Sequence, residues 1–147
     1  MIQLRNQADF VLELAINGTQ TTTAGGTAAT TTSVVPFDCY LAGVLAVLGT
    51  AGVTGTQTTD LLQNTASLVG SGTLLSYATT ATAPTYNTAG LTVNPPLFSK
   101  GDILTLTNAT IHSGTAAINQ SVLLLLKRQR GSSAFEPTQG GTVDVPV

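Results

Sequence analysis

Residues 34–59 of the chain read VVPFDCYLAGVLAVLGTAGVTGTQTT. The centre of this stretch, from Tyr40 to Leu48, is apolar apart from the tyrosine hydroxyl, and its length suits either a buried strand or a short core helix. Its flanks favour a strand, because Pro36 pushes the residue before it into extended geometry and Gly49 opens a glycine-rich segment. The sequence therefore predicts a central strand bounded by turns.

As a strand, this segment is apolar on both faces. One face carries Tyr40, Ala42, Val44, Ala46 and Leu48, and the other carries Leu41, Gly43, Leu45 and Val47. The last apolar segment, Gln120 to Arg128, is also apolar on both faces as far as Leu126. An antiparallel sheet with one face in water carries polar residues on that face, so we expect a core beneath these strands and another subunit above them. The expected subunit-interface residues are Leu41, Leu45, Val47, Leu123 and Leu125.

The chain has 147 residues, the size of a single domain that can bury a core without a metal ion or a disulfide. Its one cysteine, Cys39, cannot form a bridge within the chain and is expected to pack as a small apolar side chain. Only 8% of the residues are charged, against about 25% in ordinary domains. Threonine and other neutral polar residues must supply much of the polar surface, which is typical of β-rich proteins that function within an assembly.

The charge balance argues against several classes of partner. The net charge is −2 and the isoelectric point is about 4.9, so a basic face for nucleic acid is not expected. The opening residues, MIQLRNQADF, contain no apolar segment of the kind found in signal peptides. The longest apolar runs fall far below the roughly 20 residues of a membrane-spanning helix, so no membrane partner is expected.

Short apolar or alternating segments, separated by glycine and asparagine turns, predict an all-β protein. The expected strands lie near residues 10–17, 40–48, 56–63, 67–69, 73–77, 91–94, 103–109 and 120–128. In the first of them Phe10, Leu12, Leu14 and Ile16 are expected to face inward. About eight short strands without an amphipathic helix predict an antiparallel β-sandwich of jelly-roll type with extended terminal arms. The predicted organisation is a lead over residues 1–9, one domain over residues 10–130 and an extended tail over residues 131–147.

Three connections have sequences that indicate their conformation. Residues 18–32, GTQTTTAGGTAATTT, form either a mobile loop or a long hairpin with Gly25-Gly26 at its tip, and the hairpin is slightly preferred. A turn is expected around Asn64, since asparagine tolerates a positive φ. A second turn is expected at residues 99–102, where it leads into the strand that follows.

Three segments of the chain resemble the small jelly-roll proteins of tailed bacteriophages, the head-decoration and head-fibre group. They are VLGTAGVTGTQTTDLLQNTASLV at residues 47–69, KGDILTLTNATI at residues 100–111 and SVLLLLKR at residues 121–128. Asp60 and Asn64 match the D-x-x-x-N-G hairpin of that group, although Thr65 stands where glycine is usual. The resemblance covers roughly residues 10–130. It implies an assembly role on the exterior of a virion, often as a trimer on the capsid, and it transfers no catalytic residue.

Candidate catalytic and metal-binding side chains are few. His112, the only histidine, lies at a strand end beside Ser113 and is expected to face solvent from a loop, since no nucleophile-elbow motif is present. Asp60, Asp102 and Asp144 are too scattered for a calcium loop. One histidine and one cysteine cannot build a zinc site within one chain, which leaves only a site between subunits on a threefold axis. We expect no enzymatic activity and no cofactor.

Positive charges and a terminal alternation mark the end of the chain. A basic cluster at the end of the last strand consists of Lys127, Arg128 and Arg130, and it is either a solvated strand end or a contact with an acidic neighbour. The closing VDVPV of residues 143–147 can lie along a neighbour's sheet edge, with Pro146 limiting further pairing, and the alternative is a frayed terminus. The expected contacts with the capsid or a neighbouring subunit are Lys127, Arg128, Arg130, Phe135, Val143 and Val145.

Two functions from different classes remain. The first is a structural virion protein, a homotrimeric capsid decoration protein that stabilises a phage head by contacts with its own copies and with the major capsid protein. The alternative is a phage fibre or receptor-binding module that recognises host glycans. For that alternative only Tyr77 and Tyr86 lie in loop-prone sequence, and tryptophan is absent, so a stacking platform for sugars is poorly supplied.

Overall fold

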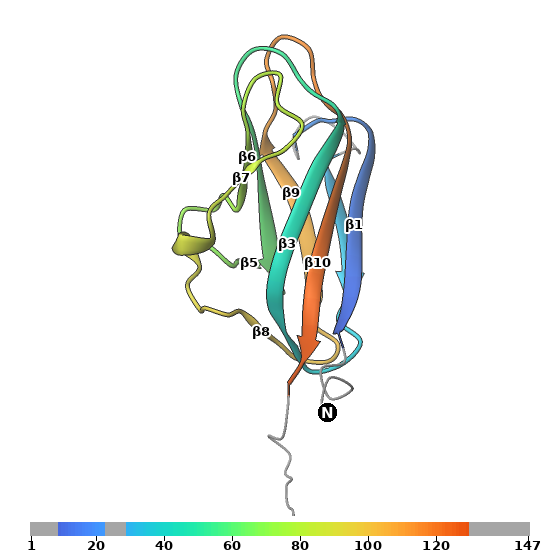
Figure 1. The fold of residues 1–147 in the computed structure, drawn as a ribbon, viewed down its shortest axis with the longest axis vertical. Coiled ribbons are helices and arrows are strands. Elements are labelled where there is room, and N and C mark those ends of the chain that lie inside the picture. The colour runs from blue at the N-terminus through green and yellow to red at the C-terminus, as the bar shows by residue number, and fades with distance from the viewer. Residues whose placement is uncertain (1–8, 23–28, 130–147) are drawn as a thin grey trace, which may run out of the picture.

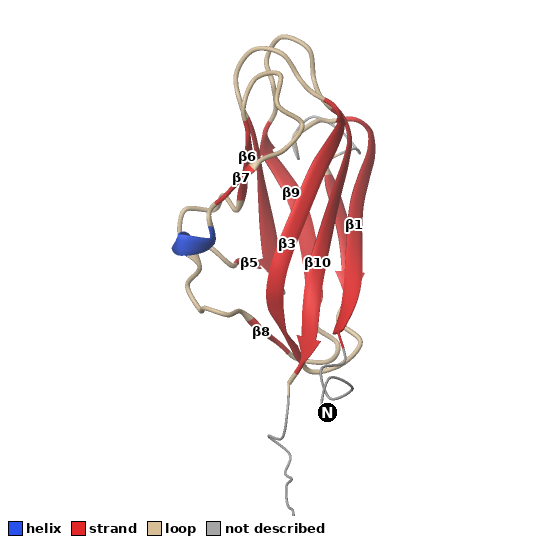
Figure 2. Ribbon diagram, viewed as in Figure 1, coloured by secondary structure: helices blue, strands red, loops and turns tan. Residues whose placement is uncertain are grey.

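The computed structural model describes residues 9–22 and 29–129, and in these ranges nearly all regular structure is β-strand (Figure 2). The strands are β1 (Asp9–Thr19), β2 (Thr30–Val34), β3 (Cys39–Thr50), β4 (Gln57–Gln63), β5 (Ala66–Ser67), β6 (Leu75–Tyr77), β7 (Thr85–Tyr86), β8 (Leu97–Phe98), β9 (Ile103–Thr110) and β10 (Ile118–Arg128). A short 3-10 turn, Thr88–Gly90, lies between β7 and β8. The predicted all-β fold is confirmed.

The strands form two antiparallel sheets that pack face to face (Figure 1). The first sheet has the order β1-β10-β3-β8 and the second the order β2-β9-β4-β6-β7, with β5 paired to the end of β4. Pairs are nested along the chain: β1 with β10, β2 with β9, β3 with β8 and β4 with β6. Such nesting is one long antiparallel hairpin wound around itself, which is the predicted jelly roll. Three strands were not predicted, β2, β7 and β8, and the strand expected at residues 91–94 does not form, so the total is ten instead of eight.

The core lies between the two sheets and is built by strand alternation. On β1, Leu14 and Ile16 are buried, while Phe10 and Leu12 pack against the core from partly exposed positions, so the predicted inward face is confirmed. The remaining leucine-rich layers come from both sheets: Val122, Leu124 and Leu126 on β10, with Leu61, Leu75, Leu104 and Leu106 opposite. The predicted burial of Cys39 is also confirmed.

A β-bulge in β3 overturns part of the predicted strand alternation. Leu125 pairs with Gly43, but the next residue of β10 pairs with Leu41, so Ala42 is the extra residue. The bulge reverses which residues face inward: Leu41 is only 6% exposed and belongs to the core, whereas Ala42 is exposed. Leu41 therefore cannot lie on the outer face, and its predicted place in a subunit interface is wrong. Beyond the bulge the predicted alternation is correct, because Leu45 faces out.

The predicted turns are confirmed. Asn64 and Thr65 have φ angles of 49° and 78°, so they form the two-residue hairpin turn that joins β4 to β5. In the turn at residues 99–102, the Asp102 carboxylate accepts hydrogen bonds from the Ser99 N–H and the Asn64 side chain. Hydrogen bonds from Asn64, Ser99 and Gln63 lower the pKa of Asp102, so this carboxylate ties the β4–β5 hairpin to the β8–β9 turn.

Two other expectations are wrong. In the described parts of residues 18–32, which are residues 18–22 and 29–32, the two arms do not pair as the expected hairpin, because β1 pairs with β10 in the first sheet and β2 pairs with β9 in the second. This segment instead connects the two sheets, and Gly25-Gly26 lies outside the described residues. No strand forms at residues 91–94, where Leu91 makes only an isolated bridge with Val69; the strand in this region is β8.

Candidate interaction surface

The outer face of the first sheet is apolar where its three long strands lie side by side (Figure 1). Its rows across β1, β10 and β3 are Val11 with Leu125 and Gly43, then Glu13 with Leu123 and Leu45, then Ala15 with Ser121 and Val47. We call its large apolar side chains the outer apolar patch: Val11, Leu45, Val47, Leu123 and Leu125. The strand pairing thus brings together four of the five predicted interface residues and adds Val11, which the sequence analysis missed.

The outer apolar patch is open to solvent. Leu45 is 68% exposed, Val11 56% and Val47 49%. Because Gly43 has no side chain, the patch contains a depression of about 220 Å³ between the side chains of β1, β10 and β3. An exposed cluster of aliphatic side chains around a hollow is typical of a protein–protein contact surface.

One hydrogen-bonded carboxylate lies inside the rows of the patch. Glu13 accepts a hydrogen bond of 2.8 Å from the Ser121 hydroxyl on the neighbouring strand. This bond satisfies one acceptor site of the Glu13 carboxylate, and no cation takes part in it. It holds the carboxylate over the outer face of the first sheet. A partner that covers the patch must leave Glu13 in contact with water or supply a donor to it.

Cationic side chains gather at one end of the sandwich, where β10 ends. Lys127 and Arg128 are the last two residues of β10, and the backbone N–H of Lys100 donates to the Asp38 carboxylate at the same end. The Arg128 guanidinium lies 3.8 Å from the centre of the Phe37 ring, so the side chain is held against the body of the protein by a cation–π contact. We call this group, together with Asp102, the charged end.

The remaining predicted contact residues, Arg130, Phe135, Val143 and Val145, lie outside the described residues.

The loops at the opposite end of the sandwich differ from the charged end. Residues 51–56, 78–84 and 111–117 contain no Asp, Glu, Lys or Arg. The two ends therefore present different chemistry to any partner.

His112 is buried, with 2% of its surface exposed, so the expectation of a solvent-facing loop histidine is wrong. Its Nε2 lies 3.2 Å from the Ala78 carbonyl oxygen, and its Nδ1 has no hydrogen-bond partner among the described residues. The ring fills the space beside Gly52, where a Cβ atom would overlap it. His112 thus lies between its own loop and the loops that contain Gly52 and Ala78. In the described structure no nucleophile is hydrogen-bonded to it.

We expect Gly52→Ala to destabilise the protein by about 1–3 kcal/mol, because the new methyl group must displace the His112 ring from a packed site. Chemical denaturation would measure the loss. Gly70→Ala is the matched control, since no atom lies within 4 Å of a Cβ at Gly70. Equal midpoints for the two variants would show that His112 does not pack on Gly52.

A buried polar network lies inside the sandwich, and the sequence analysis did not identify it. Asn108 accepts from the Thr59 hydroxyl (2.8 Å) and donates to Gln20 (2.9 Å). Gln120 donates to Thr59 (2.9 Å) and to the Tyr77 hydroxyl (3.0 Å). Burial raises the pKa of Tyr77 to about 12, so this phenol stays protonated. The network links β4, β6, β9 and β10 across the interior.

The two tyrosines of the glycan hypothesis lie in different environments. Tyr77 is fully buried in the core. Tyr86 accepts a hydrogen bond of 3.0 Å from the Ala46 N–H, so its hydroxyl covers the edge of β3. Tyr86, which is 38% exposed, is therefore the one of these two tyrosines that reaches the surface.

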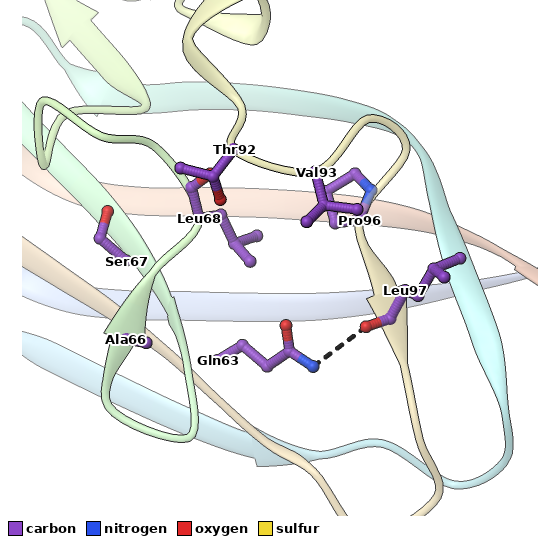
Figure 3. Close-up of a pocket in the computed structure, with 8 residues that line it drawn as sticks. All are labelled: Gln63, Ala66, Ser67, Leu68, Thr92, Val93, Pro96 and Leu97. Carbon is purple, nitrogen blue, oxygen red and sulfur yellow. Dashed lines mark hydrogen bonds between the residues drawn. The ribbon is translucent and has the colours of Figure 1, made fainter.

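A groove of about 300 Å³ opens between the β4–β5 hairpin and the chain that leads into β8 (Figure 3). Its walls include Leu68, Val93 and Leu97, and the Gln63 side chain donates to the Leu97 carbonyl oxygen across it (3.0 Å). No charged side chain lines the groove. It can hold an aliphatic group, and its lining also includes the hydroxyls of Ser67 and Thr92, of which Ser67 is hydrogen-bonded to the Asp60 carboxylate (3.0 Å).

No protein-family model, no curated protein and no solved structure matches this chain. Within residues 9–22 and 29–129, no helix has the length and hydrophobicity needed to cross a membrane. In the same ranges no three His, Cys, Asp or Glu side chains gather where they could hold a metal ion.

Proposed function

We propose that this protein is a homotrimeric decoration protein of a phage capsid, a structural component of the virion exterior without enzymatic activity. The observation that carries the proposal is the outer apolar patch, which a jelly-roll sandwich with a complete core exposes on three adjacent long strands. The resemblance of residues 47–69, 100–111 and 121–128 to phage head-decoration proteins supports the same role.

In this proposal the patch is buried between copies of the chain. The interface consists of Leu45, Val47, Leu123 and Leu125, with Val11 in place of Leu41. Burial of five such side chains contributes on the order of 10 kcal/mol, at about 1.5–3 kcal/mol each. Association itself costs about 4–15 kcal/mol, so the patch alone gives a marginal assembly and further contacts are required.

The charged end supplies those contacts in the proposal. Lys127 and Arg128 lie where the chain continues toward residues 130–147, so the basic cluster and the tail approach a neighbour together. The major capsid protein would offer acidic groups to this end. The uncharged loops at the other end would then face solvent.

The test is binding of the purified full chain to particles of the phage that encodes it, prepared without the protein. We expect the chain to sediment with these particles and to raise the temperature at which they release DNA. A chain that stays in the supernatant at saturating concentration would contradict the proposal. Binding of the chain to the tail of the phage particle, and not to its head, would instead support the fibre alternative.

A further inference from the structure

The register of the first sheet fixes which backbone groups of β1 face its free edge. Leu48 donates its N–H to the Thr82 carbonyl oxygen (2.8 Å), so the backbone of Leu48 points away from β10. Leu48 pairs with Gln120 of β10, so the backbone N–H and C=O of Gln120 must point away from β3 and toward β1. There Gln120 pairs with Ile16, and the backbone groups of these two residues face each other. Strand alternation therefore turns the N–H and C=O groups of residues 11, 13 and 15 toward the open edge.

No described residue covers this long edge of β1, whereas the other sheet edges are short or hydrogen-bonded. The far edge of β3 is bonded by Tyr86, Thr82 and Pro96, and the outer strands of the second sheet have only five and two residues. In the part of the chain that the structure describes, nothing bonds the outward backbone groups of residues 11, 13 and 15. An uncovered edge strand of 11 residues is a template for an added strand.

We propose that residues 143–147 of one copy add as an antiparallel strand to the free edge of β1 in a second copy. This proposal rests on the homo-oligomer of the proposed function and adds a specific contact between its copies. The segment lies outside the described residues, and 13 residues, 130–142, separate it from the end of the described chain at Gln129. Extended, that length spans roughly 45 Å, which is enough to reach a neighbouring sandwich.

Pro146 selects the register of the added strand. Proline has no N–H, so on an edge strand it must occupy a position that points away from β1. Val143, Val145 and Val147 then direct their N–H groups to β1. Residues that pair across an antiparallel ladder share a face, and the outward groups of β1 belong to residues on the outer face. The three valines therefore fall beside Val11 and extend the outer apolar patch.

A pair of proline variants tests this register in the full-length protein. Val145→Pro removes an N–H that must bond to β1, whereas Asp144→Pro removes one that points away. We expect the backbone amides of Val11, Glu13 and Ala15 to be protected from hydrogen exchange in the native protein. Their protection should fall at least tenfold in the Val145→Pro variant and remain in the Asp144→Pro variant.

Concentration dependence separates a second copy from pairing within one chain. Protection of the β1 amides should increase with protein concentration as the oligomer forms. Absence of protection in the native protein, equal loss in the two variants, or protection that is independent of concentration in a monomer would overturn the proposal. Because exchange is measured on the isolated protein, its failure is distinct from a failure to bind particles.

Discussion

Replacement of Leu45 by lysine is expected to dissociate the assembled protein into folded monomers. Leu45 is the most exposed side chain of the outer apolar patch, at 68%, so the isolated sandwich should tolerate the change within about 0.5 kcal/mol. In an assembly each buried lysine would cost several kcal/mol of desolvation. We expect association to weaken at least about 100-fold, with circular dichroism unchanged.

Light scattering during gel filtration would measure the effect, with Leu97→Lys as the matched control. Leu97 is 53% exposed but lies on β8, away from the patch. The control should retain the native mass. If Leu45→Lys also retained it, the patch would not be the contact between copies.

Leu41→Ala is expected to lower the free energy of unfolding by about 2–5 kcal/mol, because it empties a core site that Leu41 fills. This residue lies four positions before Leu45 on β3, yet the bulge at Ala42 turns the two side chains to opposite sides of the sheet. Denaturant titration at one fixed protein concentration would measure the loss.

Val93→Ala is the control for that titration, since Val93 is 55% exposed and outside the core. It should change stability by less than about 1 kcal/mol. A similarly small loss for Leu41→Ala would mean that Leu41 faces outward, as simple alternation predicted.

The fold could be predicted because several strands carry their orientation in their sequence. On β1 the alternation of Phe10, Leu12, Leu14 and Ile16 with smaller or polar residues marks one inward face. Asn64 similarly identified a turn that needs a positive φ. In each case the local pattern and the global packing agree, so the prediction was correct.

The bulge could not be predicted from the sequence. Between Tyr40 and Leu48 no polar side chain marks which face meets water, so an extra residue at Ala42 leaves no trace in the pattern. The same two-sided apolarity correctly placed Leu45, Val47, Leu123 and Leu125 on the outer face of the sheet but misplaced Leu41. Sequence alternation can locate such a strand but cannot fix its register around an irregularity.

The buried polar groups were missed for different reasons. The burial of His112 depends on the space beside Gly52, which only the folded loops create. Gln120 was detectable, since it precedes the inward series Val122, Leu124 and Leu126 by the same two-residue step. A glutamine at an inward position predicts a buried hydrogen-bond network, and that signal was present in the sequence.

The number and arrangement of copies on purified virions test the central claim most directly. A decoration protein should occur in many regularly spaced copies on the head, grouped in threes, and electron microscopy of particles with and without the added chain would show them. The account predicts difference density over the capsid surface with threefold symmetry. Density confined to a few copies on the tail or at one vertex, or absent from the particle, would contradict it.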